Sequence, residues 1–318
     1  MEERAHHAVQ GQSFFRRFLY WLDILDPTLL LSKEEDITNA HTLLQANGCR
    51  CQETSGDSKV QEAWRLSLAS LHPDTGSLIP LLFRPPAFLP IGAPLVIATL
   101  LPYQGMKPLF FWQLLFQTYS AGFNLANGNG TNKPEKLQSK QRILLLASIS
   151  FTTVVGTSPV YIMNRYGMNA PAMQTIFRKF VPAPLMAVLA AYNVAVTRMT
   201  EFEHGIEVVD KNGNVVGLSE KAGAKAVRET AVSRSLLFGA TALVPIVLLQ
   251  FLESTKFILR NPLALAPIRH ISTVMAFGMM IPVTFSLFPQ TGKIRREALE
   301  PKILSLTKEP ELYYNRGI

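Results

Sequence analysis

Six long stretches of this 318-residue sequence contain no Asp, Glu, Lys or Arg. Their end points give lengths of 18 to 25 residues, and they cover residues 85–106, 108–132, 143–164, 180–197, 235–252 and 271–292. A membrane hydrocarbon core about 30 Å thick needs about 20 helical residues to cross it. Buried helices of a soluble bundle seldom repeat at this length without a single charge. The windows therefore predict an all-α, multi-pass membrane protein.

The distribution of charge agrees with this prediction. Only 17% of the residues are charged, whereas soluble domains have about a quarter. The formal charge is +8, yet residues 1–84 hold 8 basic and 11 acidic side chains, so the excess of basic residues lies in the connectors and the tail. Basic residues that flank apolar windows are typical of topology signals and lipid headgroup contacts. We expect membrane lipids as partners and no nucleic acid.

The sequence divides into three parts by composition. A polar amino-terminal region covers residues 1–84, a membrane domain covers 85–292, and a tail covers 293–318. The first window of the membrane domain is rich in proline, which removes backbone hydrogen bonds and bends or breaks a helix. We therefore predict five or six spans, depending on whether this first window crosses the membrane.

One soluble insertion interrupts the membrane domain at residues 198–234. Two β-branched runs, 206–209 and 215–218, flank Asn212-Gly213, and an Asn-Gly pair in this setting is a strong hairpin signal. Residues 219–234, rich in alanine, are predicted to form a helix of the same insertion.

The amino-terminal region is predicted to be helical. Residues 13–25 place six apolar side chains, four of them aromatic rings, near one side of a helix, and the arginines lie elsewhere. Such a helix suits the membrane interface, and it equally suits packing against the rest of the region. Both alternatives stay open at this point.

The second window carries a row of polar side chains within an apolar segment. Positions 113, 117, 120, 124 and 127 recur every three or four residues and so share one helical face. Polar groups that face lipid are costly, so this face should meet a cavity, a pathway or another helix. The predicted solute-pathway residues are Gln113, Gln117, Thr118, Asn124, Asn127 and, in the fourth window, Asn193.

No motif of catalysis or cofactor binding occurs in the sequence. There is no phosphate-binding glycine loop, no nucleophile elbow and no metal-binding helix. Cys49 and Cys51 lack the spacing of a zinc site. The windows contain no carboxylate, which argues against a proton pump. We expect no enzyme activity, no cofactor and no metal site, and a neutral or zwitterionic solute if the protein is a transporter.

Several short segments resemble the sideroflexin family. The first is the turn-forming run His72, Pro73, Asp74, Thr75 and Gly76, in which proline fixes φ and glycine tolerates positive φ. The others are Phe83-Arg84, Ala87-Phe88-Leu89-Pro90, Phe111-Trp112-Gln113, Phe288-Pro289-Gln290 and the final Tyr314-Asn315-Arg316-Gly317-Ile318. The resemblance runs in order from about residue 18 to residue 318, and it is strongest to a divergent member of the family.

This resemblance implies a multi-pass protein of the mitochondrial inner membrane that transports serine and other small amino acids and is linked to iron homeostasis. The chain departs from the family pattern in its second window, where Phe116 and Ser120 replace asparagines and Gly128 replaces an arginine. Each lost partner leaves a substrate group unpaired at a cost of about 1 to 3 kcal/mol, which argues against serine itself.

Two functional hypotheses remain open. The first is a transporter of a small neutral or zwitterionic amino acid that works by alternating access. The second, implied by the resemblance to the divergent member, is a non-transporting factor for respiratory complex I assembly and iron–sulfur cluster supply.

Overall fold

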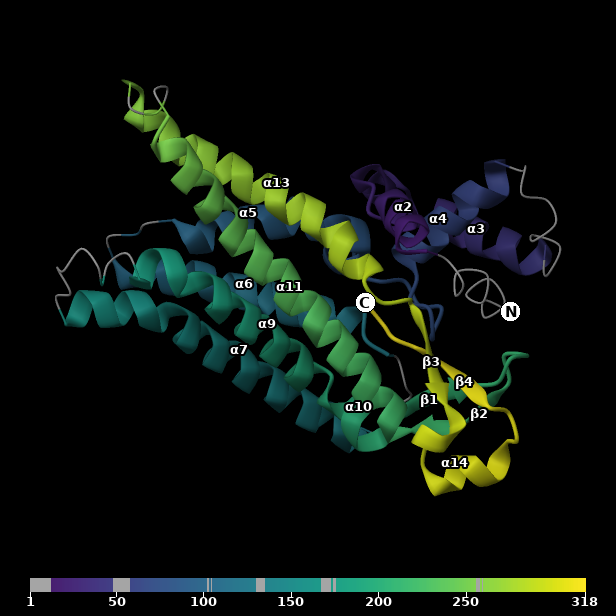
Figure 1. Ribbon diagram of the computed structural model, residues 1–318. Helices are drawn as coiled ribbons and strands as arrows, with labels where there is room; N and C mark the ends of the chain where they lie inside the picture. Colours follow the sequence, from purple (N-terminus) through teal and green to yellow (C-terminus); the bar gives the residue numbers. More distant parts are fainter. Residues whose placement is uncertain are drawn as a thin grey trace.

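The computed structural model describes residues 13–47, 58–101, 103, 105–129, 135–166, 173, 176–255, 258 and 260–318. Cys49 and Cys51 lie outside these residues. The described chain is mostly helical, and its long helices run beside one another as a bundle (Figure 1). The amino-terminal helices and a small sheet both lie at one end of this bundle.

Each uncharged window corresponds to one helix of the bundle. These helices are α5 (Phe88–Leu100), α6 (Met106–Ala126), α7 (Glu135–Arg165), α9 (Pro182–Thr197), α11 (Glu220–Glu253) and α13 (Leu265–Ser286). α11 packs against both α9 and α13, and α6 packs against α7. The core is rich in aromatic rings contributed by α5, α6, α11 and α13, so α11 and α6 lie at the centre of the packing.

Among the described residues, three helices are long and apolar enough to cross a membrane: Gln141–Arg165 of α7, α11 and α13. α5 has 13 residues and α9 has 16, which gives lengths of about 20 and 24 Å. α5 is short because it begins after Pro85 and Pro86. α6 has 21 residues, but its polar face lowers its hydropathy. The number of spans, five or six, therefore stays a prediction.

The helix expected to belong to a soluble insertion is part of the bundle. α11 begins at Glu220, where the Ser219 side chain accepts a hydrogen bond from the backbone N–H of Ala222, and it continues without interruption to Glu253. The expectation of a separate helix over 219–234 is therefore wrong. No glycine or proline stands at the boundary of the two segments, so nothing ends the helix there.

The predicted hairpin is confirmed, and the tail extends it. β1 (Ile206–Val209) and β2 (Val215–Ser219) pair antiparallel. β3 (Thr291–Arg295) and β4 (Glu311–Asn315) complete a sheet with the order β2-β1-β4-β3, and the short helix α14 (Pro301–Leu306) packs near β2. The predicted helical fold with one hairpin is therefore confirmed in part: the described chain is mostly helical, but the tail adds two strands that were not predicted. The added strands stabilise a hairpin that would be marginally stable alone.

The described residues of the amino-terminal region include the α-helices α2 (Phe14–Ile24), α3 (Glu34–Asn47) and α4 (Ser58–Ser70). α2 docks on the end of α13, since the ring of Trp21 lies 5.1 Å from that of Phe285 and Arg17 Nε donates to the Ser286 carbonyl at 2.9 Å. Packing therefore accounts for one side of α2. The opposite side leaves Phe14 and Phe15 exposed, as an interfacial helix would.

The remaining short elements connect these parts. They are η1 (Pro27–Leu31), η3 (Leu81–Phe83), η4 (Pro85–Ala87), η5 (Ile176–Phe180), α10 (Met199–His204), η6 (Pro262–Ala264) and η7 (Arg296–Ala298).

Candidate functional site

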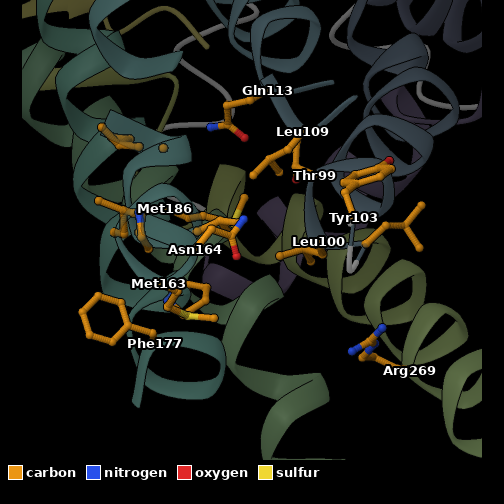
Figure 2. Close-up of a pocket in the computed structure, with 17 residues that line it drawn as sticks. Thr99, Leu100, Tyr103, Leu109, Gln113, Met163, Asn164, Phe177, Met186 and Arg269 are labelled. Atoms are coloured by element: carbon orange, nitrogen blue, oxygen red, sulfur yellow. The ribbon is translucent and has the colours of Figure 1, made fainter. Parts of the chain in front are cut away.

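A cavity of about 250 Å³ lies among α5, α6, α7, α9 and α13 (Figure 2). Most of its lining is apolar, as in many ligand pockets. Its polar groups include Gln113 and Arg269, which Figure 2 shows on opposite sides, together with Tyr103 and Asn164. Asn164 is exposed, so the cavity reaches the surface of the bundle.

Gln113 enters this cavity because α6 and α7 approach each other closely at Gly156. A Cβ atom at Gly156 would collide with the side-chain amide of Gln113. The glycine in the third window therefore makes room for Gln113, the first residue of the polar row on α6. Its role was not predicted, because its contact comes from a different helix.

The polar row predicted on α6 is buried in the bundle. It starts at Gln113 beside the cavity and continues through Gln117, Ser120, Asn124 and Asn127, all of them buried. From Gln113 to Asn127 the row covers fourteen residue steps, or about 21 Å along the α6 axis. Thr118 is exposed and donates its hydroxyl to the Leu114 carbonyl at 2.8 Å, so the structure places it away from this row.

Three of the predicted pathway residues form a connected chain of amides. Asn193 of α9 is completely buried, and its Oδ1 accepts from Asn124 Nδ2 at 3.0 Å. Its Nδ2 donates to Gln117 Oε1 at 3.5 Å. Amide side chains offer both donors and acceptors, so the same groups can pair with each other or with a polar solute.

Arg234 of α11 extends the chain of amides, and the sequence analysis missed it. Its Nε donates to Asn124 Oδ1 at 3.4 Å. Its guanidinium lies 5.0 Å from the ring centroid of Phe88, 5.2 Å from that of Phe123 and 4.6 Å from that of Phe285. Such contacts stabilise a cation by about 0.5 to 2 kcal/mol each, whereas desolvation of an ion costs several kcal/mol. We call this arrangement of Arg234 and three rings the aromatic cage.

A sequence signal for Arg234 existed at the edge of a window. The uncharged stretch 235–252 starts at the next residue, so counting uncharged positions ended the span at the arginine. No helix-breaking residue separates Arg234 from the window, so the arginine belongs to the same helix. A basic residue at a window edge is equally typical of a topology signal, so the burial of Arg234 is seen only from its contacts with other helices.

The far end of the α6 row is closed by residues 315–318, which we call the terminal plug. Arg198 Nη2 donates to the Arg316 carbonyl at 2.6 Å, and the backbone N–H of Ile318 donates to the Asn127 carbonyl at 3.0 Å. Arg316 Nη2 donates to the Phe285 carbonyl at 3.2 Å. Gly317 has φ 72°, and a Cβ there would lie 2.9 Å from Arg198 Nη2. Asn127 therefore contacts the plug, away from the chain of amides.

The turn over residues 72–76 supports the terminal plug. His72 Nε2 donates to the Gly128 carbonyl at 2.7 Å, while its Nδ1 accepts from the backbone N–H of Asp74 at 3.2 Å. Asp74 Oδ1 accepts from Asn315 Nδ2 at 2.7 Å. Gly76, at φ 63°, closes the turn with its N–H on the His72 carbonyl. These contacts give the motif a structural role at the closed end.

Pro73 and Thr75 complete this turn. The Thr75 hydroxyl lies 2.7 Å from that of Ser77, and Pro73 lines a small cavity beside Ile318. Pro73 therefore lies near the plug and near Asn127 at the end of the α6 row, and Thr75 stabilises the turn.

A buried ion pair and further polar contacts reinforce the closed end. Glu201 accepts from Arg198 Nε and Nη2, both at 2.7 Å, and from Asn129 Nδ2 at 2.8 Å. Burial lowers the pKa of Arg316 to about 10, so this arginine stays charged at neutral pH. Burial and the neighbouring Glu229 raise the pKa of Tyr314, whose hydroxyl donates to Glu229 Oε2 at 3.2 Å.

These features define a helical membrane protein with a row of buried polar side chains that runs from a cavity to a sealed end. The chain belongs to the sideroflexin family, since the family model for sideroflexins matches residues 5–318. It is 50% identical to sideroflexin-4 of Danio rerio over 310 residues, which cover 97% of this chain and 96% of the relative.

Other relatives give the same family. Identity to human sideroflexin-4 is 40% over 309 residues, with 97% of this chain and 90% of the relative covered. Identity to human sideroflexin-5 is 34% over 312 residues, with 97% and 91% covered. No solved structure matches the chain.

Proposed function

We propose that this sideroflexin transports a small neutral or zwitterionic amino acid across the mitochondrial inner membrane by alternating access. The observation that supports the proposal is the polar row of α6, which begins at a cavity near Gln113 and ends at the terminal plug near Asn127. A carrier needs states in which its pathway is open at one end and closed at the other. The arrangement corresponds to one such state.

The side chains along the row suit a zwitterion with few further polar groups. The amides of Gln117, Asn124 and Asn193 offer donors and acceptors to an ammonium and a carboxylate. Phe116, at a family asparagine position, packs against Phe238 with ring centroids 5.3 Å apart and offers the row no polar atom. Fewer polar partners favour a substrate such as alanine or glycine over serine.

Uptake by the full-length protein in liposomes tests this proposal. We expect labelled alanine or glycine to enter faster than in empty liposomes, and Gln117→Leu to slow uptake about tenfold, because one unpaired polar group costs about 1 to 3 kcal/mol. Thr118→Val, on the exposed side of the same helix, is the matched control and should leave uptake unchanged. Absence of uptake by the wild-type protein for every amino acid of a full panel would refute the proposal.

A second candidate function is a factor that holds respiratory complex I or iron–sulfur assembly partners and so connects to iron homeostasis. The observation that favours it is the edge strand β2, on which Val215 and Leu218 are 58% and 56% exposed. An edge strand with exposed apolar side chains is a surface on which another chain can pair.

Rescue of cells that lack the protein separates the two functions. If transport matters, Gln117→Leu should fail to restore complex I while Leu218→Glu succeeds. The reverse pattern would favour the assembly role of β2 and contradict transport as the function.

A further inference from the structure

The buried arginines Arg198 and Arg234 differ in how many of their donors have a partner. Arg198 is paired with Glu201 and fills its other donors with Thr230 and the Arg316 carbonyl. Arg234 is only 2% exposed, and among the described residues it forms no ion pair and its Nη2 has no hydrogen-bond partner. A buried charged donor without a partner is expensive, so this guanidinium is incomplete in the closed protein.

The aromatic cage does not supply the missing partner. The rings of Phe88, Phe123 and Phe285 stabilise the charge of Arg234 through their faces, but they accept no conventional hydrogen bond. They also keep water away from the guanidinium, which strengthens any ionic contact formed there. The cage therefore leaves Nη2 buried and without a hydrogen-bond acceptor.

The charges around Arg234 favour an anionic group. Three guanidiniums, those of Arg198, Arg234 and Arg316, are buried in this part of the bundle. Two carboxylates face them: Glu201 in its ion pair, and Glu229, which attracts Arg316. Arg17 and Lys225 act on the same groups, so positive charge exceeds negative charge around this cluster and an anionic group would be attracted to it.

We propose that Arg234 is the anchor for one carboxylate group of the transported amino acid, an inference that rests on the proposed function. The guanidinium presents a planar fork of donors to a carboxylate, and Asn124, Asn193 and Gln117 continue from its Nε side with acceptors for the ammonium. One end of a zwitterion then meets a caged cation and the other meets neutral amide oxygens.

Contacts around the anchor explain how it is closed in this structure. The ring of Phe285 contacts the guanidinium of Arg234, and the carbonyl of Phe285 accepts a hydrogen bond from Arg316 of the terminal plug. From the cavity, the row from Gln113 through Gln117 leads toward Asn124. The anchor therefore lies between the cavity and the plug, where an occluded substrate would be held.

Thermal unfolding of the purified full-length protein in lipid nanodiscs tests the anchor. The probes are L-alanine, L-alaninamide, which keeps the ammonium but lacks the carboxylate, sodium acetate and sodium chloride. We expect L-alanine to raise the Tm of the wild-type protein and L-alaninamide and chloride to leave it unchanged. Arg234→Gln should weaken the response to L-alanine at least tenfold, and Arg228→Gln, an exposed arginine of the same helix, should not change it.

A charge-retaining variant keeps the test decisive if Arg234→Gln does not fold. Arg234→Lys keeps a positive charge but loses the planar fork, so its apparent affinity for L-alanine should fall several-fold while its response to acetate stays detectable. An equal response of Arg234→Gln and wild type to L-alanine, or an equal response to alanine and alaninamide, would overturn the anchor but not transport. A response to chloride alone would overturn it in favour of an inorganic anion.

The outcome also separates the anchor from the proposed function. If wild-type protein responds to acetate and Arg234→Gln does not, while no amino acid binds or is taken up, the anion site stands and amino-acid transport fails.

Discussion

The two ends of the α6 polar row are built differently. At the cavity end, Gln113 lies among mostly apolar side chains, and the space results from a glycine on a neighbouring helix. At the plug end, residues 316 and 318 form short hydrogen bonds with the Asn127 carbonyl and the Arg198 side chain. Apolar contacts can slide, whereas a buried polar network is stable only when it is fully paired. The plug end should therefore be the harder of the two to open.

The largest expected effect comes from breaking the ion pair at the plug end. Glu201→Gln removes the charge that compensates buried Arg198, and loss of one partner from a buried pair costs about 3 to 5 kcal/mol. The measurement is the Tm of the purified protein in nanodiscs. Glu207→Gln, an exposed glutamate of β1, should leave the Tm unchanged. Equal Tm values for the two variants would show that the ion pair does not hold this end together.

A smaller effect is expected at the cavity end from Gly156→Ala. The added Cβ would overlap the Gln113 amide, and overpacking of this kind costs about 1 to 3 kcal/mol. Displacement of Gln113 should also slow amino-acid uptake. Gly105→Ala, where the nearest atom is 3.8 Å from a new Cβ, is the control. Uptake at the wild-type rate by Gly156→Ala would mean that Gln113 is not part of the pathway.

At the plug end, Gly317→Ala places a residue with a side chain at a position of positive φ. A residue with a Cβ costs about 1 to 2 kcal/mol in the left-handed region, and the new methyl group would press on Arg198. We expect a lower Tm and easier digestion of residues 311–318 by carboxypeptidase. If digestion proceeds as in the wild type, Gly317 does not fix the plug.

The smallest effect is expected from Asp74→Ala in the turn over residues 72–76. The variant loses the hydrogen bond that Asn315 donates to Asp74. This bond is exposed to solvent, and such a bond contributes about 0.5 to 1.5 kcal/mol to stability. The Tm should fall by less than in Gly317→Ala. A fall as large as that of Glu201→Gln would indicate that the turn, rather than the ion pair, holds the plug.

Local patterns predicted the local structure well. Charge-free windows located the bundle helices, and the Asn212-Gly213 pair located the hairpin. The spacing of polar residues in the second window predicted the buried face of α6. These patterns act within a few turns or a few residues, so they can be seen in one segment of sequence.

The remaining features depend on contacts between distant segments. Val208 pairs with Tyr314, and neither strand is complete without the other, so the tail gave no signal strong enough to predict a sheet. The environment of Arg234 is set by aromatic rings on three other helices. The candidate anchor therefore could not be derived by inspecting α11 alone.

The sheet has a consequence for the order in which the protein is assembled. β4 follows α13 in the chain and lies between β1 and β3, so the hairpin remains two-stranded until α13 has been synthesised and the tail returns to it. A two-stranded hairpin is marginally stable in water. Protection of residues 206–219 from proteases during synthesis would thus mark the moment at which the last bundle helix reaches its place. The plug, which directly follows Tyr314, would arrive with it.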